Sequence, residues 1–410
     1  MSAMQQIPLS SVAVISAGQS APKDNEFSDS GTPFVRAGSL DSLLSGKNEA
    51  DLELVPDETA KTRRLKLYPR GAILFAKSGM SATKDRIYVL RNPAFVVSHL
   101  AILTPNDKVH ADYLRLALKR FPPSVLIKDP AYPAISLGEI QDYKIPIPDS
   151  IDDQIRIAHL LGKVERLIAQ RKQHLQQLDE LLKSVFLEMF GDPVRNEKGW
   201  ERTTIGSLAT EVKYGTSASA QGGQYKYLRM NNITQDGYWN FNSLKYIEVS
   251  EKDFEKYFLQ KGDLVFNRTN SKELVGKTAV YNSDEPVIIA GYLIRVRFSN
   301  KTNPWFVWGH LNSKFGKTRL FNLCRNIVGM ANINATELKE IPILKPPINL
   351  QNKFAAIVEK VDGIKIRYQQ SLTELESLYN ALSQQAFKGE LDLSRVVLVT
   401  KNTEGAEAER

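Results

Sequence analysis

Basic and polar side chains gather directly after two apolar, strand-like runs in the second half of the chain. The run YKYL precedes Arg229, Asn231 and Asn232, and the run DLVF precedes a glycine-containing polar segment. That segment carries Arg268, Thr269, Asn270, Ser271, Lys272 and Lys277. Arginine and asparagine can form paired hydrogen bonds with guanine and adenine, whereas lysine more often holds phosphates. As groups, these loops predict contact with DNA, while each single residue could instead only solvate its loop.

The first half of the chain carries a related set of side chains. The segment PFVRAGSL (33–40) resembles KYLRMNNI (226–233), which places Arg36 over Arg229. The segment LYPRGAILFAKSG (67–79) resembles FLQKGDLVFNRTN (258–270), which places Lys77 over Arg268. The equivalent candidates for DNA contact are Arg36, Lys77, Ser78, Ser81, Thr83, Lys84 and Arg86.

Other motifs suggest catalysis or metal binding but lack the residues that such chemistry needs. NPAF (92–95) is similar to the Asn/Asp-Pro-Pro-Tyr/Phe motif of amino-methyltransferases. Ala94 replaces the second proline, however, and no glycine-rich S-adenosylmethionine loop follows, so we expect a turn. PDETAK (56–61) lacks the further acidic residue and lysine of a metal-dependent nuclease, so we expect a solvated loop. The histidines, His99, His110, His159, His174 and His310, show no ligand spacing.

Two smaller expectations concern single residues. His99 corresponds to Tyr292 in the second half; both side chains could face DNA, but we expect them to pack within strands. Cys324 is the only cysteine, which excludes an internal disulfide framework and a cysteine metal cluster.

The basic charge of the chain is unevenly distributed. The formal net charge is +8, and residues 195–345 carry 22 Lys and Arg against 14 Asp and Glu. Residues 1–150 carry 18 against 16. The basic excess suits a polyanionic partner, nucleic acid above all, although it could also serve solubility alone.

Two long segments are copies of one another and would position these loops. When Gln154 is placed over Gln351, an offset of 197 residues (351 − 154), Ala158 lies over Ala355 and Phe190 over Phe387. The apolar positions alternate at spacings of three and four, the pattern of a coiled-coil seam. The seam residues are Leu161, Val164, Ile168, Leu175, Leu178, Leu182, Val185, Val358, Val361, Leu372, Leu375, Tyr379 and Leu382. Gly191 and Gly389 suit helix ends.

These observations predict an α+β protein with two sheet-rich domains in tandem, each followed by a long helix. The predicted domains are residues 1–148 and 192–346, the helices are 149–191 and 347–390, and a disordered tail is 391–410. If the two seams pair within the chain, the helices must form an antiparallel coiled coil with pseudo-two-fold symmetry. Two separate amphipathic core helices are the alternative.

This organisation resembles the specificity subunit of type I restriction–modification systems over residues 1–393. The resemblance rests on the segment from Ile145 to Gln154, on FGD (Phe190–Asp192) and on AFKGEL (Ala386–Leu391). It implies two target recognition domains, which each read one half of a bipartite, asymmetric double-stranded DNA site, and helices that dock two methyltransferase subunits. It implies that this chain is non-catalytic and holds no cofactor. Partner subunits would bind S-adenosylmethionine, ATP and Mg²⁺, and restriction subunits would cut DNA.

Further expectations follow from the differences between the halves and from the termini. Residues 76–90 match 267–281 poorly, so the two domains should read different half-sites. A self-sufficient DNA-modifying or DNA-cleaving enzyme, or a structural coiled-coil adaptor without a DNA role, are the alternatives. The chain lacks an apolar run of membrane-spanning length and a signal peptide, which predicts a cytoplasmic protein without a membrane partner.

Overall fold

The chain folds into two units that each combine one globular part with segments of both long helices. The computed structural model describes residues 4–323, 325–327, 330–394 and 396. The first unit joins residues 1–170 to 372–410, and the second comprises residues 171–371. Cys324 and most of the predicted tail lie outside the described residues.

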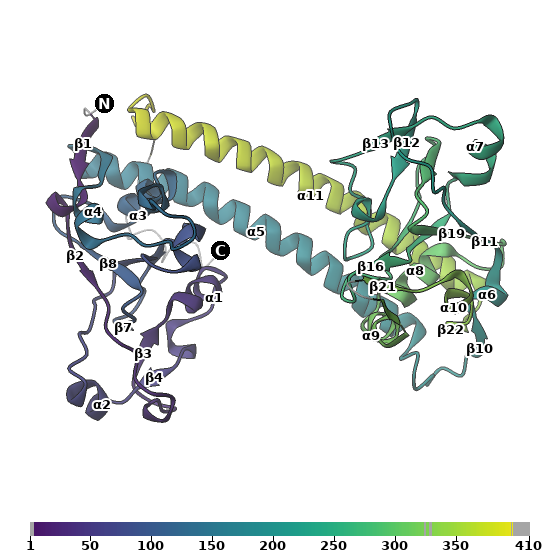
Figure 1. Ribbon diagram of the computed structural model, residues 1–410, viewed down its shortest axis with the longest axis horizontal. Coiled ribbons are helices and arrows are strands. Elements are labelled where there is room, and N and C mark those ends of the chain that lie inside the picture. The colour runs from purple at the N-terminus through teal and green to yellow at the C-terminus, as the bar shows by residue number, and fades with distance from the viewer. Residues whose placement is uncertain (1–3, 324, 328–329, 395, 397–410) are drawn as a thin grey trace, which may run out of the picture. The chain divides into compact units, whose positions relative to one another are not determined.

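The first unit contains a four-stranded sheet, a three-stranded sheet and a two-stranded ribbon (Figure 1). The strand orders are β2–β8–β5–β6, β4–β3–β7 and β1–β9. The strands are β1 (Met4–Pro8), β2 (Ala13–Ala17), β3 (Thr32–Val35), β4 (Leu54–Val55), β5 (Ile73–Ala76), β6 (Tyr88–Val89), β7 (Phe95–Val96), β8 (Leu100–Pro105) and β9 (Lys144–Pro148). The helices of this part are α1 (Leu40–Leu44), α2 (Asp57–Thr62), α3 (Ala111–Arg120) and α4 (Leu137–Asp142). Residues 57–62 thus form a short helix where a loop was expected.

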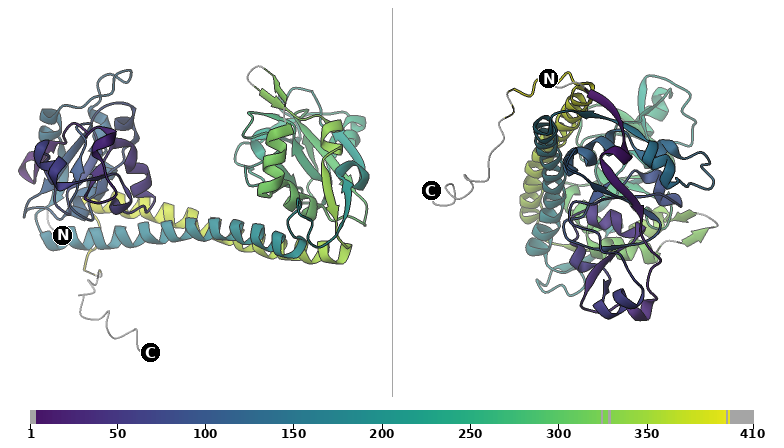
Figure 2. Two further views of the ribbon diagram at one scale, coloured as in Figure 1. Left: turned by 90° about the horizontal axis from the view of Figure 1, so that it is seen from below. Right: turned by 90° about the vertical axis from the view of Figure 1, so that its left-hand side faces the viewer.

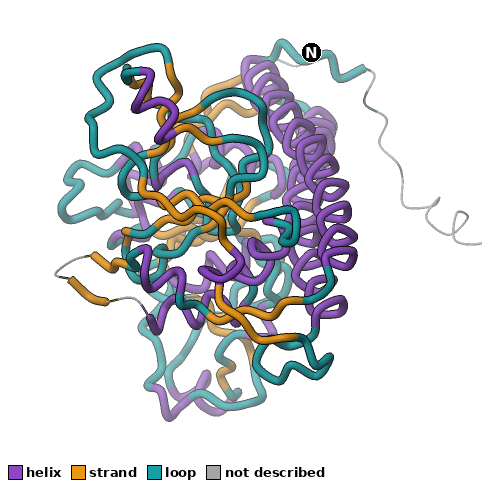
Figure 3. The backbone as a smooth tube through the Cα atoms, turned by 90° about the vertical axis from the view of Figure 1, so that its right-hand side faces the viewer, coloured by secondary structure: helices purple, strands orange, loops and turns teal. Residues whose placement is uncertain are grey.

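The second unit repeats this topology. Its sheets have the orders β11–β19–β15–β17 and β13–β12–β18–β14, its ribbon is β10–β22, and an additional sheet has the order β16–β21–β20. The strands are β10 (Glu201–Thr204), β11 (Ala209–Tyr214), β12 (Tyr225–Leu228), β13 (Lys245–Ile247), β14 (Phe258–Leu259), β15 (Leu264–Asn267), β16 (Thr269–Asn270), β17 (Thr278–Val280), β18 (Val287–Ile289), β19 (Leu293–Phe298), β20 (Arg325–Ile327), β21 (Met330–Asn332) and β22 (Pro342–Lys345). The helices are α6 (Ile205–Leu208), α7 (Glu251–Tyr257), α8 (Pro304–Asn312), α9 (Lys314–Leu323) and α10 (Ala335–Lys339). Figure 2 shows each unit from two further directions, and Figure 3 shows the second unit with its strands in orange.

The two long helices are α5 (Ile151–Phe190) and α11 (Ile348–Lys388). Gly191 and Gly389 follow their last residues with φ angles of 79° and 74°, a backbone conformation that glycine adopts without steric cost. All the predicted seam residues are buried or half-buried, whereas most residues between them are exposed.

The helix segments pair in opposite directions within each unit. In the second unit, Arg171 lies 4.3 Å from the ring centroid of Tyr368, and Phe186 lies 5.3 Å from Phe354, ring to ring. Rising numbers in α5 therefore meet falling numbers in α11, which confirms the antiparallel arrangement. Arg171 and Tyr368 are themselves 197 residues apart (368 − 171), so equivalent positions of the repeat touch each other.

The outer ends of the helices also serve as core helices of the globular parts. Phe186, Phe190 and Phe354 belong to the main core of the second unit, and Leu161 and Phe387 to that of the first. The coiled-coil pattern and the core-helix pattern thus occur in the same two helices, at different positions along them.

A buried glutamine joins each long helix to its globular part. In the second unit, the Gln351 side chain accepts a hydrogen bond from the Asn303 backbone N–H at 2.9 Å and donates one to the Pro346 carbonyl at 2.8 Å. In the first unit, the Gln154 side chain accepts from the His110 backbone N–H at 2.8 Å. Gln154 and Gln351, the pair used to align the two copies of the repeat, therefore make equivalent hydrogen bonds in the two units.

In the part of the chain that the structure describes, every helix is too short or too polar to cross a lipid bilayer.

Candidate nucleic-acid interface

In the first unit, the segment after β5 is held between two other segments. The Lys77 backbone N–H donates to the His99 carbonyl at 2.9 Å, and the Ile135 N–H donates to the Lys77 carbonyl at 2.8 Å. Ser78 forms an antiparallel bridge with Ala134, and its hydroxyl shares a hydrogen bond of 2.9 Å with Nδ1 of His99. Both backbone groups of Lys77 are therefore occupied, which fixes where its side chain begins.

The second unit holds its equivalent segment in the same way. The Arg268 N–H donates to the Tyr292 carbonyl at 3.0 Å, and the Ile333 N–H donates to the Arg268 carbonyl at 2.9 Å. Thr269 pairs with Asn332 in antiparallel register, where Ser78 bridges Ala134 in the first unit. The sequence alignment of Lys77 with Arg268 thus corresponds to a shared backbone geometry.

The second predicted segment of each unit lies beside the first. Arg36 follows β3, which runs parallel to β7, and the Val97 N–H donates to the Val35 carbonyl at 3.0 Å. Arg229 follows β12, which runs parallel to β18 in the same manner. Both arginines therefore border the turn that carries His99 or Tyr292.

The two arginines differ in what they bind within the protein. Arg36 forms an ion pair of 2.5 Å with Glu53 and lies 5.2 Å from the ring of Phe27. Arg229 donates to the Ser243 carbonyl at 2.9 Å. Both arginines are half-buried residues with a defined side-chain orientation, but Arg36 already donates from Nε and Nη2 to the Glu53 carboxylate.

The remaining candidates of the first unit divide into exposed and occupied residues. Ser81, Thr83 and Lys84 lie in the 3-10 helix η5 (Met80–Lys84), and Lys84 is exposed. Arg86 instead forms an ion pair with Asp41, and its side chain is only 14% exposed. We therefore assign Arg86 to the scaffold that supports this helix.

Two candidates of the second unit are buried, which is contrary to the expectation of DNA contact. The ammonium group of Lys277 donates to the carbonyls of Met230 and Ile233 at 2.7 and 2.6 Å, and burial lowers its pKa. Asn232 is fully buried and accepts from the Arg229 N–H at 2.9 Å. Both side chains stabilise the loop after β12, because their polar atoms are already bound inside the protein.

Thr269 is also buried, whereas the other candidates on this loop, Arg268, Asn270, Ser271 and Lys272, are half-buried. Arg268 stacks on Tyr214 at 4.8 Å, and Lys272 lies 4.5 Å from the ring of Phe321. The Thr269 hydroxyl donates to Asn332 at 3.0 Å, and the Asn270 side chain accepts from the Ser271 N–H at 2.9 Å. Asn231 is exposed.

Four exposed side chains beside these loops are absent from the predicted DNA contacts. Tyr292 is 53% exposed, and His99 is also exposed, so the expectation that they pack within strands is wrong. Tyr132 and Met330, which are 82% and 54% exposed, each stand three residues before the isoleucine that binds Lys77 or Arg268. The sequence carried a signal for Tyr132 and Met330. The segments ISLGEI (135–140) and INATEL (333–338) resemble each other, and each of these two residues lies three positions before the start of its segment.

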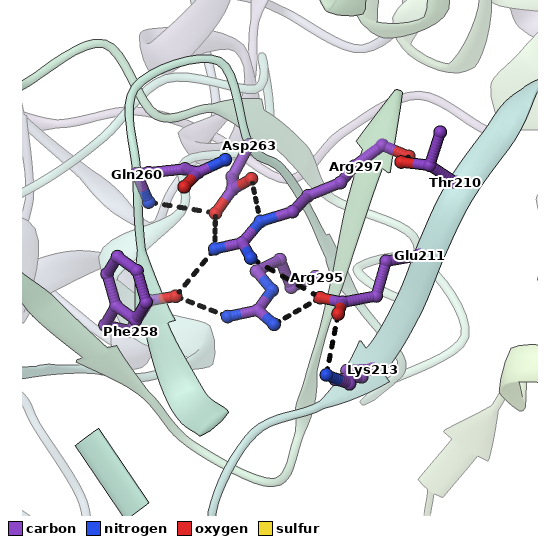
Figure 4. Close-up of polar contacts among 8 residues, drawn as sticks. All are labelled: Thr210, Glu211, Lys213, Phe258, Gln260, Asp263, Arg295 and Arg297. Atoms are coloured by element: carbon purple, nitrogen blue, oxygen red, sulfur yellow. Dashed lines mark hydrogen bonds and ion pairs between the residues drawn. The ribbon is translucent and has the colours of Figure 1, made fainter. Parts of the chain in front are cut away.

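A buried ionic cluster stiffens the sheet from which the Arg268 loop emerges (Figure 4). Arg295 on β19 is 1% exposed and contacts Glu211 and the Phe258 carbonyl, and Arg297 contacts Asp263 at 2.8 Å. Burial alone would raise the pKa of Glu211, but hydrogen bonds from Lys213 and Arg295 outweigh it and hold the pKa below its usual value. The cluster is a support for the loop, because its charges are bound to each other.

Two units of this topology in one chain are the arrangement of a class of DNA specificity proteins. The family model of the type I restriction modification DNA specificity domain matches residues 1–180 and again 197–377. The chain therefore belongs to this family and carries its domain twice, as the resemblance in the sequence indicated.

Relatives of nearly the same length carry the same tandem. The chain is 23% identical to the specificity subunit of the type I restriction enzyme EcoKI from Escherichia coli K12, over 94% of this chain and 88% of that protein. It is 26% identical to the StySPI specificity subunit from Salmonella potsdam, with the same coverage. The crystal structure of the S subunit from M. genitalium matches with a TM-score of 0.59 and 15% identity, over 94% of this chain and 96% of that one.

Proposed function

We propose that this chain is the non-catalytic DNA-recognition subunit of a type I restriction–modification complex, and that each unit reads one half of a bipartite, asymmetric site. The observation that carries the proposal is a backbone arrangement that both units share and that we call the clamp. In it, the N–H and the carbonyl of Lys77 or Arg268 are both hydrogen-bonded to neighbouring segments. The clamp presents different side chains in the two units, since Ser78 stands where Thr269 does, and His99 where Tyr292 does. One scaffold with two sets of contact residues suits two different half-sites.

The proposal includes two methyltransferase subunits that dock on the long helices. Leu167 and Leu378 are 42% and 46% exposed in the first unit, and Leu181 and Ile364 are 47% and 39% exposed in the second. Three of them stand one position before a seam residue, and Ile364 stands before Lys365, the repeat equivalent of the seam residue Ile168; an offset of 197 residues relates 167 to 364 and 181 to 378. Each unit thus offers the same pair of apolar side chains, which suits two copies of one partner.

Heptad geometry places this apolar pair on the side of the helices away from the globular parts. In each heptad, the residue that flanks the seam on the opposite side faces the globular part. Ala158, Phe186, Ala355 and Ser383 occupy such positions, and all four are buried. The side that carries Leu167 and its counterparts is therefore the one left for a partner. Restriction subunits would complete the complex in the cytoplasm, and S-adenosylmethionine, ATP and Mg²⁺ would bind to the partner subunits.

A genome-wide map of methylated adenines tests the proposal. Single-molecule sequencing of cells with and without the gene should show one split motif, methylated on both strands, that disappears on deletion. A continuous palindromic motif, or DNA cleavage by the purified chain alone, would contradict it.

A further inference from the structure

Lysine is the most frequent residue in the lining of one cavity of the second unit. Its volume is about 530 Å³, and it lies between α9, the last third of α5 and the loop that follows β16. The charged lining residues are Lys183, Lys272, Lys277, Lys314 and Lys317 against Asp236 and Glu273. Five lysines therefore line this space against two acidic residues, and the ammonium group of one of them, Lys277, is bound to the carbonyls of Met230 and Ile233.

The two carboxylates leave most of this positive charge uncompensated. Asp236 lies 3.9 Å from Lys183, and both side chains are more than half exposed. The Glu273 carboxylate is bound by its own backbone N–H and by Ser271, which lower its pKa. Within the described chain, Lys272, Lys314 and Lys317 have no carboxylate at ion-pair distance.

Lys317 is the most constrained of these three residues. It is half-buried on α9, and its ammonium group has no hydrogen-bond partner among the described residues. Burial lowers the pKa of Lys317 to about 8, with Lys277 and Lys183 adding to this effect and Asp236 opposing it. A cation in such surroundings gains stability when an anion enters.

We propose that this cavity binds a phosphate group, with Lys317 as its inner ligand and Lys272 and Lys314 at its mouth. In the assembled complex, the phosphate is a backbone phosphodiester of the half-site read by the second unit. The loop gives the reason, because Lys272 follows directly on Arg268 to Ser271, the segment proposed to contact DNA. A DNA strand that touches Arg268 therefore passes the mouth of the cavity. This assignment rests on the proposed function, whereas the phosphate site itself does not.

The dependence of DNA affinity on salt tests the site in the full complex. Lys317→Gln should reduce the slope of log K against log salt by about one and weaken binding equally for all half-site sequences. Lys317→Arg should restore the slope. Lys252→Gln, at an exposed lysine on α7 outside the cavity, is the matched control and should leave it unchanged. An unchanged slope in Lys317→Gln would overturn the assignment to DNA.

The pH dependence provides a second readout. In the absence of an anion Lys317 loses its proton near pH 8, so DNA affinity should fall as the pH rises through 8 in the natural chain but not in Lys317→Arg. The facing groups, Lys183, Lys272, Lys277 and Lys314 with Asp236 and Glu273, are the same in both proteins. Equal pH dependence of the two proteins would contradict the role of Lys317.

Inorganic phosphate distinguishes the two sources of the anion. If phosphate raises the melting temperature of the natural chain but not of Lys317→Gln, while the DNA slope is the same for both, the ligand is a free phosphate and the DNA assignment fails. If neither phosphate nor the slope responds to Lys317→Gln, the site does not exist. A complex that binds no DNA would refute the proposed function, and the phosphate measurement would still decide the site.

Discussion

Gln351 shows how a single side chain ties a long helix to a globular part. Replacement by alanine leaves the Asn303 N–H and the Pro346 carbonyl without their partner inside the protein. Gln351→Ala should therefore lower the free energy of unfolding by about 1–3 kcal/mol. Urea unfolding followed by tryptophan fluorescence measures this, since all four tryptophans lie in the second unit. The exposed Gln384→Ala is the control, and an equal loss in both variants would contradict the anchoring role.

Glu211 makes the stability of the second unit depend on pH. Its pKa in the folded state is below the ordinary value of 4.5, so its stabilising contribution is complete above that value and is lost as the pH falls through the folded pKa. Urea midpoints should therefore decline below about pH 4.5 in the natural chain and decline less in Glu211→Gln. Glu211→Gln should also be less stable at pH 7, because Arg295 then lacks its charged partner. Parallel pH curves would show that other carboxylates dominate.

Arg268 should act on one half-site only. Its backbone is fixed on both sides and its guanidinium stacks on Tyr214, so Arg268→Ala should cost about 1–3 kcal/mol for the preferred base and relax selectivity there. Binding of the full complex to duplexes that vary one position at a time measures this. A uniform loss over all sequences would identify Arg268 as a phosphate contact instead.

The sequence alone predicted that the candidate residues follow strands, but it did not predict the burial of each side chain. Arg36, Lys77, Arg229 and Arg268 follow strands, and a strand end is visible as a local pattern. Lys277 follows a strand-like run as well, yet it points inward, because its carbonyl partners come from a loop more than forty residues earlier. A contact between residues so distant in sequence leaves no local trace.

At the scale of elements, α5 and α11 should tolerate an added charge at exposed positions but not at the buried positions of the seam between them. Leu372 is 6% exposed, so Leu372→Glu places an unpaired carboxylate between the helices. Because a buried charge without a partner is costly, the substitution should lower the free energy of unfolding by about 3 kcal/mol or more. Circular dichroism during thermal unfolding measures the loss. Ser377→Glu adds the same charge at an exposed position of the same helix and should change stability little. Similar melting curves would mean that the seam does not hold the helices together.

The long helices were predictable because their signal is one-dimensional. Spacings of three and four, with a glycine at each end, define a helix and its buried face without knowledge of the partner. The strand orders are different, since the pairing of β3 with β7, or of β12 with β18, joins strands that lie far apart in the chain. The repeat indicated that both units share one topology, but it could not indicate which topology.

For the whole molecule, we expect the helix pair to determine the spacer between the half-sites. One heptad adds about 10.5 Å to a helix, which corresponds to about three base pairs of DNA at roughly 3.4 Å each. Insertion of a heptad after Arg171 and another after Tyr368 should lengthen the preferred spacer by about that amount. Methylation of a library of spacers measures it. A single insertion, in α5 only, should disturb the seam instead, and an unchanged spacer in the double insertion would contradict the expectation.

The division of the first unit between both ends of the chain has a consequence for biosynthesis. Phe387 packs on Tyr113 and Phe121, with ring centroids 5.6 Å apart in both pairs. Residues from 372 onward leave the ribosome after residues 171–371, so the first globular part waits for them before its core closes, whereas the second unit can already fold. A chain released early leaves those two rings uncovered, and exposed apolar surface of this kind attracts proteases and chaperones. Quality control can thereby remove a subunit with only one finished reader before it meets a partner.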